Sequence, residues 1–279
     1  MSLQARRVVE LPSLNAVAVS SVASSSHPVG VRKYHTTIFR YKAGTDNQAT
    51  LEAAITNVKV LINGKEQWSL SLARLNALLL QEGYAFQTGH IVIPWSFFKS
   101  RTPAGEEALG LGTADITTLS VELTISGAAT SPTLTGWAEI EDVAEVSGAI
   151  RKIRTFPSKV CSGAGLFQIQ DLPKRPQEAY RRIHLFAAQA TAVKVMVDGV
   201  EWFNMPRAVA AALYAKQSLT HPTSAYSVLF DATQQTTDIL PMVRNVGGAT
   251  LPVQEFRLDI TMGAAETFDI VTETIGIAD

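Results

Sequence analysis

Five histidines and one cysteine are the side chains of this chain best suited to metal binding or nucleophilic catalysis. A divalent metal needs several His, Cys, Asp or Glu ligands close together. No two histidines lie within three residues of each other; they are His27, His35, His90, His184 and His221. Cys161 precedes a Ser-Gly-Ala-Gly segment that resembles a nucleophile loop, but no histidine is close to it in sequence. We therefore expect no catalytic, cofactor-binding or metal-binding residue.

Two metal-dependent alternatives remain open at this point. A tandem cupin-type enzyme is the least favoured function, because it needs two histidines spaced by one residue, a nearby carboxylate and a third histidine. A structural divalent ion is the second alternative, since Asp115, Asp231 and Asp238 lie in two long loops and could bind calcium. Nothing in their spacing requires an ion. The chain also lacks the G-x-x-x-x-G-K-[ST] phosphate-binding motif.

Two basic doublets, Arg6-Arg7 and Arg151-Lys152, lie 145 positions apart. If the chain is internally repeated, both doublets lie at the same end of the protein. Anionic lipid headgroups attract basic side chains near a membrane by about 1 kcal/mol each. We therefore expect Arg6, Arg7, Arg151 and Lys152 to face a membrane, with ordinary solvated strand ends as the alternative interpretation.

The overall charge argues against a dedicated nucleic-acid binder. The 279 residues include 24 Lys and Arg against 25 Asp and Glu, which leaves a net charge of −1. We interpret a further basic cluster as a solvated loop leading into a strand: Lys174, Arg175, Arg181 and Arg182. Charged residues make up only 18% of the chain, and a nearly neutral chain has little self-repulsion. The composition therefore favours a protein that works in an assembly and binds no specific nucleic-acid sequence.

Targeting and cross-linking signals are weak. A single cysteine permits no intramolecular disulfide, and no apolar segment directly follows Arg6-Arg7 as in a signal peptide. The uncharged stretch Leu11–Val31 is long enough to cross a bilayer, but its six serines and two prolines make it a poor membrane span. We expect a soluble protein that is intracellular when it is synthesised.

An internal repeat organises the chain. The segment TNVKVLINGKE at Thr56–Glu66 recurs 135 positions later as TAVKVMVDGVE at Thr191–Glu201. Each copy is followed by aromatic residues and then by a helical pattern, at Ser71–Glu82 and Met205–Gln217. The larger offset of the basic doublets implies about ten more residues in the first half, which we place in the 42–54 loop. The sequence predicts two tandem domains, 1–147 and 148–279.

Each half has the pattern of an all-β domain. Short runs with period-two alternation between turns favour a sandwich or barrel. The predicted strands of the first half are Arg7–Leu11, Tyr34–Tyr41, Val58–Ile62, Ile91–Trp95, Leu119–Ile125 and Leu134–Ile140, with weaker candidates at Ala16–Val22 and Gln67–Leu70. Asn63-Gly64 and Asp198-Gly199 suit the positive φ angles of type I′ hairpin turns. We predict two tandem eight-stranded jelly rolls, each with one short inserted helix, in preference to immunoglobulin-like sandwiches.

This pattern resembles the double jelly-roll major capsid proteins of membrane-containing icosahedral viruses, and most closely those of corticovirus-like bacteriophages. The similarity is strongest in the second half, in LPKRPQEAYRRIHLFAAQATAVKVMVDGVEWFN from Leu172, then in FRLDITM and in the closing VTETIGIAD. The family has no short catalytic signature, so the resemblance depends on architecture and dispersed residues.

The resemblance implies a structural, non-enzymatic function. Such proteins form homotrimers whose six jelly rolls make a pseudo-hexagonal capsomer, and these capsomers cover an icosahedral shell over an internal membrane. The implied partners are further copies of the chain, then penton and minor membrane-associated capsid proteins and anionic lipid headgroups. The implied location is the capsid of the virion, with synthesis in the host cytoplasm. The long loops Lys99–Thr118 and Asp231–Pro252 would form outward projections and contacts between subunits.

A tandem carbohydrate-binding or adhesin module is the main alternative function. Such a module needs a cluster of exposed aromatic residues on one face of a sheet. The four tryptophans are Trp68, Trp95, Trp137 and Trp202, and each lies within an apolar strand or hairpin pattern. We expect all four to pack in the core, which favours the capsid function.

Overall fold

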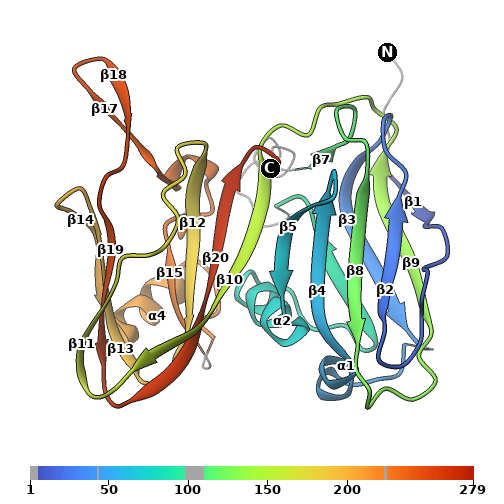
Figure 1. Ribbon diagram of the computed structural model, residues 1–279, viewed down its shortest axis with the longest axis horizontal. Coiled ribbons are helices and arrows are strands. Elements are labelled where there is room, and N and C mark those ends of the chain that lie inside the picture. The colour runs from blue at the N-terminus through green and yellow to red at the C-terminus, as the bar shows by residue number, and fades with distance from the viewer. Residues whose placement is uncertain (1–5, 43, 98–109, 223–224) are drawn as a thin grey trace. The chain divides into compact units, whose positions relative to one another are not determined.

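The computed structural model describes residues 6–42, 44–97, 110–222 and 225–279. The chain divides into two compact units (Figure 1). The first unit comprises Met1–Leu80, Tyr84–Ile153 and Ile277–Asp279, and the second comprises Gln81–Gly83 and Arg154–Gly276. The domain boundary expected between residues 147 and 148 stays a prediction.

The first unit is a jelly roll of two sheets. One sheet has the order β1-β9-β3-β6, and the strand β7 also pairs with β3. These strands are β1 (Arg7–Glu10), β9 (Leu134–Glu141), β3 (Lys33–Tyr41), β6 (His90–Pro94) and β7 (Leu111–Gly112). The other sheet has the order β5-β4-β8-β2. Its strands are β5 (Lys65–Leu70), β4 (Ile55–Ile62), β8 (Leu119–Ile125) and β2 (Val22–His27).

The second unit repeats this topology strand by strand. Its sheets have the orders β10-β20-β12-β15, with β16 also paired to β12, and β11-β19-β13-β14. The first sheet contains β10 (Ile150–Cys161), which begins in the first unit, β20 (Glu266–Gly276), β12 (Glu178–Phe186), β15 (Tyr226–Leu229) and β16 (Leu240–Pro241). The second contains β11 (Gly165–Ile169), β19 (Phe256–Met262), β13 (Ala190–Val197) and β14 (Val200–Pro206). The prediction of two tandem eight-stranded jelly rolls is confirmed.

The helices follow the repeat, with one addition in the first unit. Helix α2 (Leu72–Gln81) and helix α4 (Arg207–Lys216) occupy equivalent places after β5 and β14. A further helix, α1 (Gln48–Ala54), lies within the loop in which extra residues were expected. The side chain of Asn47 accepts a hydrogen bond from the Thr50 amide and caps the first turn of α1. The described residues of the first half therefore contain two helices where the sequence predicted one.

Both repeated hairpins turn as the sequence predicts. Asn63 and Gly64 have φ angles of 52° and 74°, and Asp198 and Gly199 have 47° and 79°, as a type I′ turn requires. The side chain of Asn63 also accepts a bond from the amide of Thr117, at 2.8 Å. Asp198 does the same for the amides of two residues just before β19. The turn residues thus fix the chain direction and also attach each hairpin to the next strand of its sheet.

One predicted strand is misplaced. The segment at Ala16–Val22 is largely not a strand, because Ala16 and Ser20 take positive φ angles of 55° and 56° that interrupt an extended chain. The strand begins at Val22 instead and continues to His27. In β8 the burial of the side chains follows the alternation of apolar and polar residues in the sequence. Every second side chain is buried, as expected for a sheet with one face on the core.

Each unit has its own aromatic core. In the first unit the rings of Trp68 and Trp95 lie 5.7 Å apart, and in the second Tyr180 and Phe256 lie 4.8 Å apart. Buried tyrosines reinforce the repeat, because the hydroxyl of Tyr34 donates to the Pro28 carbonyl and the hydroxyl of Tyr180 to the Pro173 carbonyl. Among the described residues, no helix combines the length and apolar character needed to cross a bilayer.

Candidate functional site

A cluster of buried charges lies inside the second unit. Arg181 and Arg182, on β12, are only 4% and 2% exposed. Asp231, which follows β15, receives bonds from both guanidinium groups at 2.6 to 2.9 Å. Glu82, just after α2, also accepts from both arginines, at 2.7 and 2.9 Å. The arginines therefore connect three separate parts of the second unit.

His184 extends this charge cluster along β12. Its Nε2 lies 2.9 Å from Oε1 of Glu273 on β20, and its Nδ1 lies 2.9 Å from the hydroxyl of Ser227 on β15. The other oxygen of Glu273 accepts from Arg181 at 3.0 Å. Two guanidinium groups therefore face three carboxylates, and His184 lies between Glu273 and Ser227.

The charge cluster shifts the pKa values of its members. Burial by itself raises the pKa of Asp231, but the adjacent Arg181 and Arg182 outweigh this effect and hold the pKa below its ordinary value. Burial lowers the pKa of Arg182, yet the carboxylates of Asp231, Glu82 and Glu273 leave it above its ordinary value. Asp231 and Arg182 are therefore both ionised near neutral pH, and each of these buried charges has an opposite partner.

The charge cluster corrects one sequence-based expectation. The sequence predicts that Arg181 and Arg182 lie in a solvated loop leading into a strand, but both are buried within a strand. In the repeat Arg181 is equivalent to His35 on β3, since each is the extra residue where the register shifts, in β3–β9 and in β12–β20. The sequence signal for this cluster was a pair of arginines in an apolar strand pattern, but their partners are about 50 to 100 residues away.

The three aspartates considered for calcium lie in separate settings. Asp231 is bound to the buried arginines, as described above. Asp115 accepts bonds from the amide and hydroxyl of Ser147, which keep its pKa below its ordinary value although burial raises it. Asp238 pairs with Thr233 in the loop that follows β15. Across the described ranges, no three His, Cys, Asp or Glu side chains are grouped so that they could hold a metal ion.

The four basic residues expected to face a membrane differ in exposure. Arg7 is half-exposed and forms an ion pair with Asp142 at 2.7 Å, and Arg6 lies 3.4 Å from Glu141. Arg151 and Lys152, by contrast, are 5% and 1% exposed, and Lys152 is paired with the side chain of Asp279. A lipid headgroup cannot reach these two side chains in the folded chain, so the membrane-facing role stays a prediction for Arg6 and Arg7.

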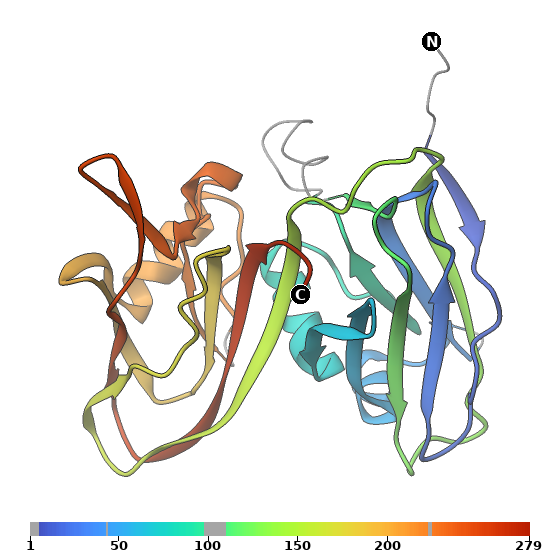
Figure 2. The same cartoon turned by 45° about the horizontal axis from the view of Figure 1, so that its top comes forward.

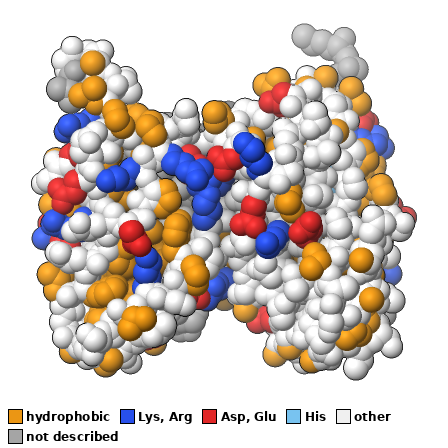
Figure 3. Space-filling view, viewed as in Figure 1, with side chains coloured by type: hydrophobic (Ala, Val, Ile, Leu, Met, Phe, Trp, Pro, Cys, Tyr) orange, Lys and Arg blue, Asp and Glu red, His pale blue; other side chains and the backbone are white. Residues whose placement is uncertain are grey.

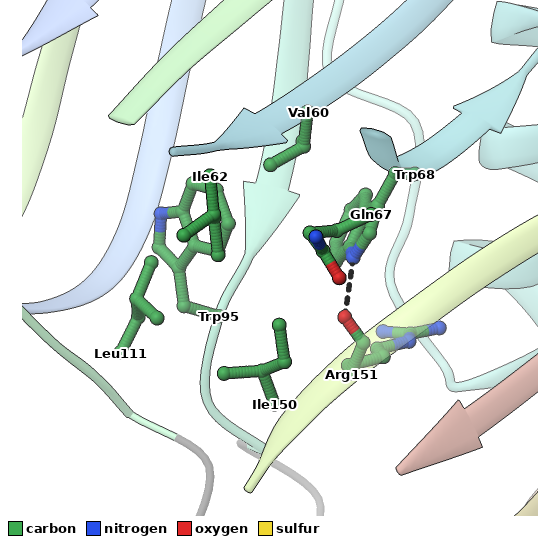
Figure 4. A pocket seen from close by; sticks show the side chains of 8 residues that line it. All are labelled: Val60, Ile62, Gln67, Trp68, Trp95, Leu111, Ile150 and Arg151. Atoms are coloured by element: carbon green, nitrogen blue, oxygen red, sulfur yellow. Dashed lines mark hydrogen bonds between the residues drawn. The ribbon is translucent and has the colours of Figure 1, made fainter. Parts of the chain in front are cut away.

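The buried position of Arg151 has a definite structural cause. The indole N–H of Trp68, on β5, donates a 2.6 Å hydrogen bond to the Arg151 carbonyl (Figure 4). The guanidinium of Arg151 lies over the Trp68 ring, 5.5 Å from its centroid, which adds a cation–π contact. The neighbouring residue Ile153 pairs with Trp68 in parallel register. The start of β10 therefore closes the edge of β5.

The tryptophans do not all pack in the core. Trp68 and Trp95 are buried as expected, and Trp137 is partly buried beneath the guanidinium of Arg40. Trp202 is 52% exposed, so the expectation for this residue is wrong. The reason is a register shift between β13 and β14, where Val195 pairs with Phe203 and Met196 pairs with Glu201. Trp202 is the extra residue of this bulge and does not point into the core.

One of the two long loops is fully described and contains a projecting hairpin (Figure 1). Most of the loop Lys99–Thr118 lies outside the described residues, and its final part contains β7. The segment Asp231–Pro252 contains the short helix η1 (Thr236–Asp238), β16 and a hairpin of β17 (Val243–Val246) and β18 (Ala249–Pro252). Figures 1 and 2 show this hairpin projecting beyond the sheets of the second unit. Asp231 connects the base of the projection to the charge cluster.

Neither Cys161 nor the described side chains on the face drawn in Figure 3 form a further organised site. The Cys161 thiol is buried and donates to the Gly163 carbonyl at 3.1 Å, which satisfies it within its own turn. On the face drawn in Figure 3, basic side chains lie close to acidic ones and hydrophobic side chains are scattered between them. No single-sign patch dominates this face, as the nearly neutral net charge suggests.

Comparison with known proteins agrees with the strand topology. The family model of the viral coat protein P2 N-terminal domain matches residues 8–141, and that of the P2 C-terminal domain matches residues 150–278. The chain is 27% identical to the major capsid protein P2 of Pseudoalteromonas phage PM2 over 209 residues, which is 72% of this chain and 73% of that protein.

Structural comparison extends the similarity to the whole chain. The crystal structure of the PM2 protein P2 superimposes with a TM-score of 0.87 and 21% identity, covering 99% of this chain and 98% of that chain. The crystal structure of the STIV MCP superimposes with a TM-score of 0.66 and 10% identity, covering 98% of this chain and 97% of that chain. The PBCV-1 virus capsid model superimposes with a TM-score of 0.62 and 10% identity, covering 98% of this chain and 95% of that chain. With both family models matched in tandem, this chain belongs to the viral coat protein P2 family and is a structural protein of a virus capsid.

Proposed function

We propose that this protein is the major capsid protein of an icosahedral bacteriophage with an internal membrane, and that three copies form a pseudo-hexagonal capsomer. The observation that supports this most strongly is the duplication itself. Two jelly rolls with the same strand order give one chain two similar bodies. Three such chains supply six bodies, the number that a pseudo-sixfold capsomer requires. The match to the PM2 major capsid protein agrees with this function.

The proposed partners are other copies of the chain, first within a trimer and then between trimers. Penton proteins, minor membrane-associated capsid proteins and anionic lipid headgroups are the further partners that a shell over a membrane needs. We propose no catalysis and no sequence-specific nucleic-acid binding. The isolated histidines and the near-balance of basic and acidic residues support both statements.

The oligomeric mass in solution tests this proposal. Size-exclusion chromatography with light scattering should give three times the chain mass of 30.1 kDa. Negative-stain images of the same fraction should show a threefold particle with a hexagonal outline. A monodisperse monomer across a range of salt and protein concentrations would contradict the capsomer. For the adhesin alternative, the expected result is a monomer that binds a glycan through exposed Trp202.

A further inference from the structure

Among the described residues of the first unit, one strand pairing has no counterpart in the second unit. The antiparallel pairings of the first unit recur in the second: β1–β9 corresponds to β10–β20, β3–β9 to β12–β20, and β4–β5 to β13–β14. The exception is the parallel pairing of β10 with β5, in which Ile153 lies opposite Trp68. In the repeat, β10 corresponds to β1 and β5 corresponds to β14. A matching contact would therefore join β1 to β14.

The edge of β14 resembles the edge of β5, but among the described residues no strand pairs with it as β10 pairs with β5. Both strands carry a bulge at the same place, 135 positions apart, with Gln67 and Trp202 as the extra residues. Gln67 is 1% exposed and Trp202 is 52% exposed. On the helix that follows, Leu78 is fully buried, whereas its equivalent Leu213 is 37% exposed. Within the described residues, β13 is the one strand that pairs with β14.

Strand β1 is exposed at a position where its equivalent strand, β10, is buried. Val8 on β1 is equivalent to Ile153 on β10, 145 positions later. Ile153 is fully buried, but Val8 is 70% exposed. Strand β1 is also the edge of its sheet, with β9 as its neighbour among the described residues. An exposed edge strand of this kind can pair with another strand through its main chain.

We propose that β1 of a second copy of this chain pairs in parallel with β14, with Val8 of one copy opposite Phe203 of the other. In this contact Trp202 lies against the incoming strand, at the position that its equivalent Gln67 occupies beside the start of β10. The inference rests on the proposed trimer, since it states which surfaces hold the trimer together.

The repeat explains why the occupant is a second copy. Each chain offers one β1 and one β14, which are different surfaces, so the contact is head-to-tail. A head-to-tail contact forms a closed ring when its rotation closes. Three such contacts, one between each pair of neighbouring chains, would close a trimer. An exposed tryptophan at a strand edge is also typical of the residues that dominate binding at protein interfaces.

Two single substitutions test the contact in the full-length chain. Trp202→Ser removes the exposed ring, and Val8→Asp places a charge on the edge of β1. Each should raise the protein concentration at which the trimer dissociates by at least tenfold, as measured by light scattering over a dilution series. Val160→Asp is the matched control, because Val160 is 63% exposed but lies on β10 away from both edges. This variant should remain as trimeric as the unmodified protein.

Hydrogen exchange on the unmodified protein provides a test that does not depend on how a variant folds. Edge amides without a strand partner exchange rapidly, so the amides of β14 and β1 should be protected in the trimer and should exchange faster after dissociation. The contact would be overturned if the trimers of Trp202→Ser and Val8→Asp were as stable as the unmodified trimer. Rapid exchange of the β14 amides within the unmodified trimer would overturn it as well. Both results leave the proposed capsomer intact, whereas an unmodified protein that stays monomeric contradicts the capsomer itself.

Discussion

The guanidinium of Arg182 binds both carboxylate oxygens of Asp231, with Nε 2.7 Å from Oδ1 and Nη2 2.9 Å from Oδ2. Both side chains are almost fully buried. This two-bond geometry is the strongest form of an arginine–carboxylate contact. It also joins β12 to the first residue of the long segment that ends in the β17–β18 hairpin.

Removing one charge from this pair should destabilise the protein strongly. Arg182→Met leaves the buried carboxylate of Asp231 with one guanidinium in place of two, and breaking such a pair costs about 3–5 kcal/mol. We expect a clear fall in the midpoint of urea unfolding. The control is Lys59→Met, which breaks the exposed pair with Glu66 and should cost less than about 1 kcal/mol. Equal effects of the two substitutions would show that the buried cluster adds no special stability.

Acid should weaken the first jelly roll through His27. Burial lowers the pKa of His27 to about 4, whereas the unfolded value is near 6.5. The unfolded chain therefore binds more protons between these pH values, so the free energy of unfolding is highest above pH 6.5 and falls by roughly 3 kcal/mol down to pH 4. His27→Gln should flatten this dependence, as measured by urea unfolding at a series of pH values. An unchanged slope would mean that other groups cause the acid sensitivity.

Gly89 should tolerate no side chain. Its φ angle is +65°, and an added Cβ would lie 2.4 Å from the Cα of Gly44. Gly89→Ala should therefore lower the free energy of unfolding by roughly 2 kcal/mol or more, from backbone strain and from the clash. Gly163→Ala is the matched control, since nothing lies within 4 Å of the added Cβ. Its thermal midpoint should stay close to that of the unmodified protein, and a similar loss in both variants would contradict the close approach.

Binding to anionic membranes should depend on Arg6 and Arg7 if this end of the protein faces lipid. Replacing both with Ser removes two charges, each worth about 1 kcal/mol near an anionic surface, and should weaken binding to phosphatidylserine liposomes roughly 30-fold. Arg175 and Arg244, which are 48% and 45% exposed, provide a matched double replacement in the second unit. If the two double variants bind liposomes equally, or if neither differs from the unmodified protein, the membrane-facing role is wrong.

The sequence by itself determined the duplication, the strands and the turns. These are local properties: period-two alternation marks a strand such as β8, and Asn63-Gly64 or Asp198-Gly199 requires a particular turn wherever it occurs. The shift from an offset of 145 to one of 135 also located the extra residues of the first half, because it depends only on counting along the chain.

Only the tertiary structure decided which side chains are buried against distant partners. Arg181 meets Glu82 across 99 residues, and no local pattern distinguishes a buried, paired arginine from a solvated one. In the same way, Gln67 and Trp202 occupy equivalent bulges, yet one is covered and the other is exposed. Their difference depends on whether another strand lies along the sheet edge. Alternation shows which face of a strand is apolar, but the long-range pairing of strands decides which edge is closed.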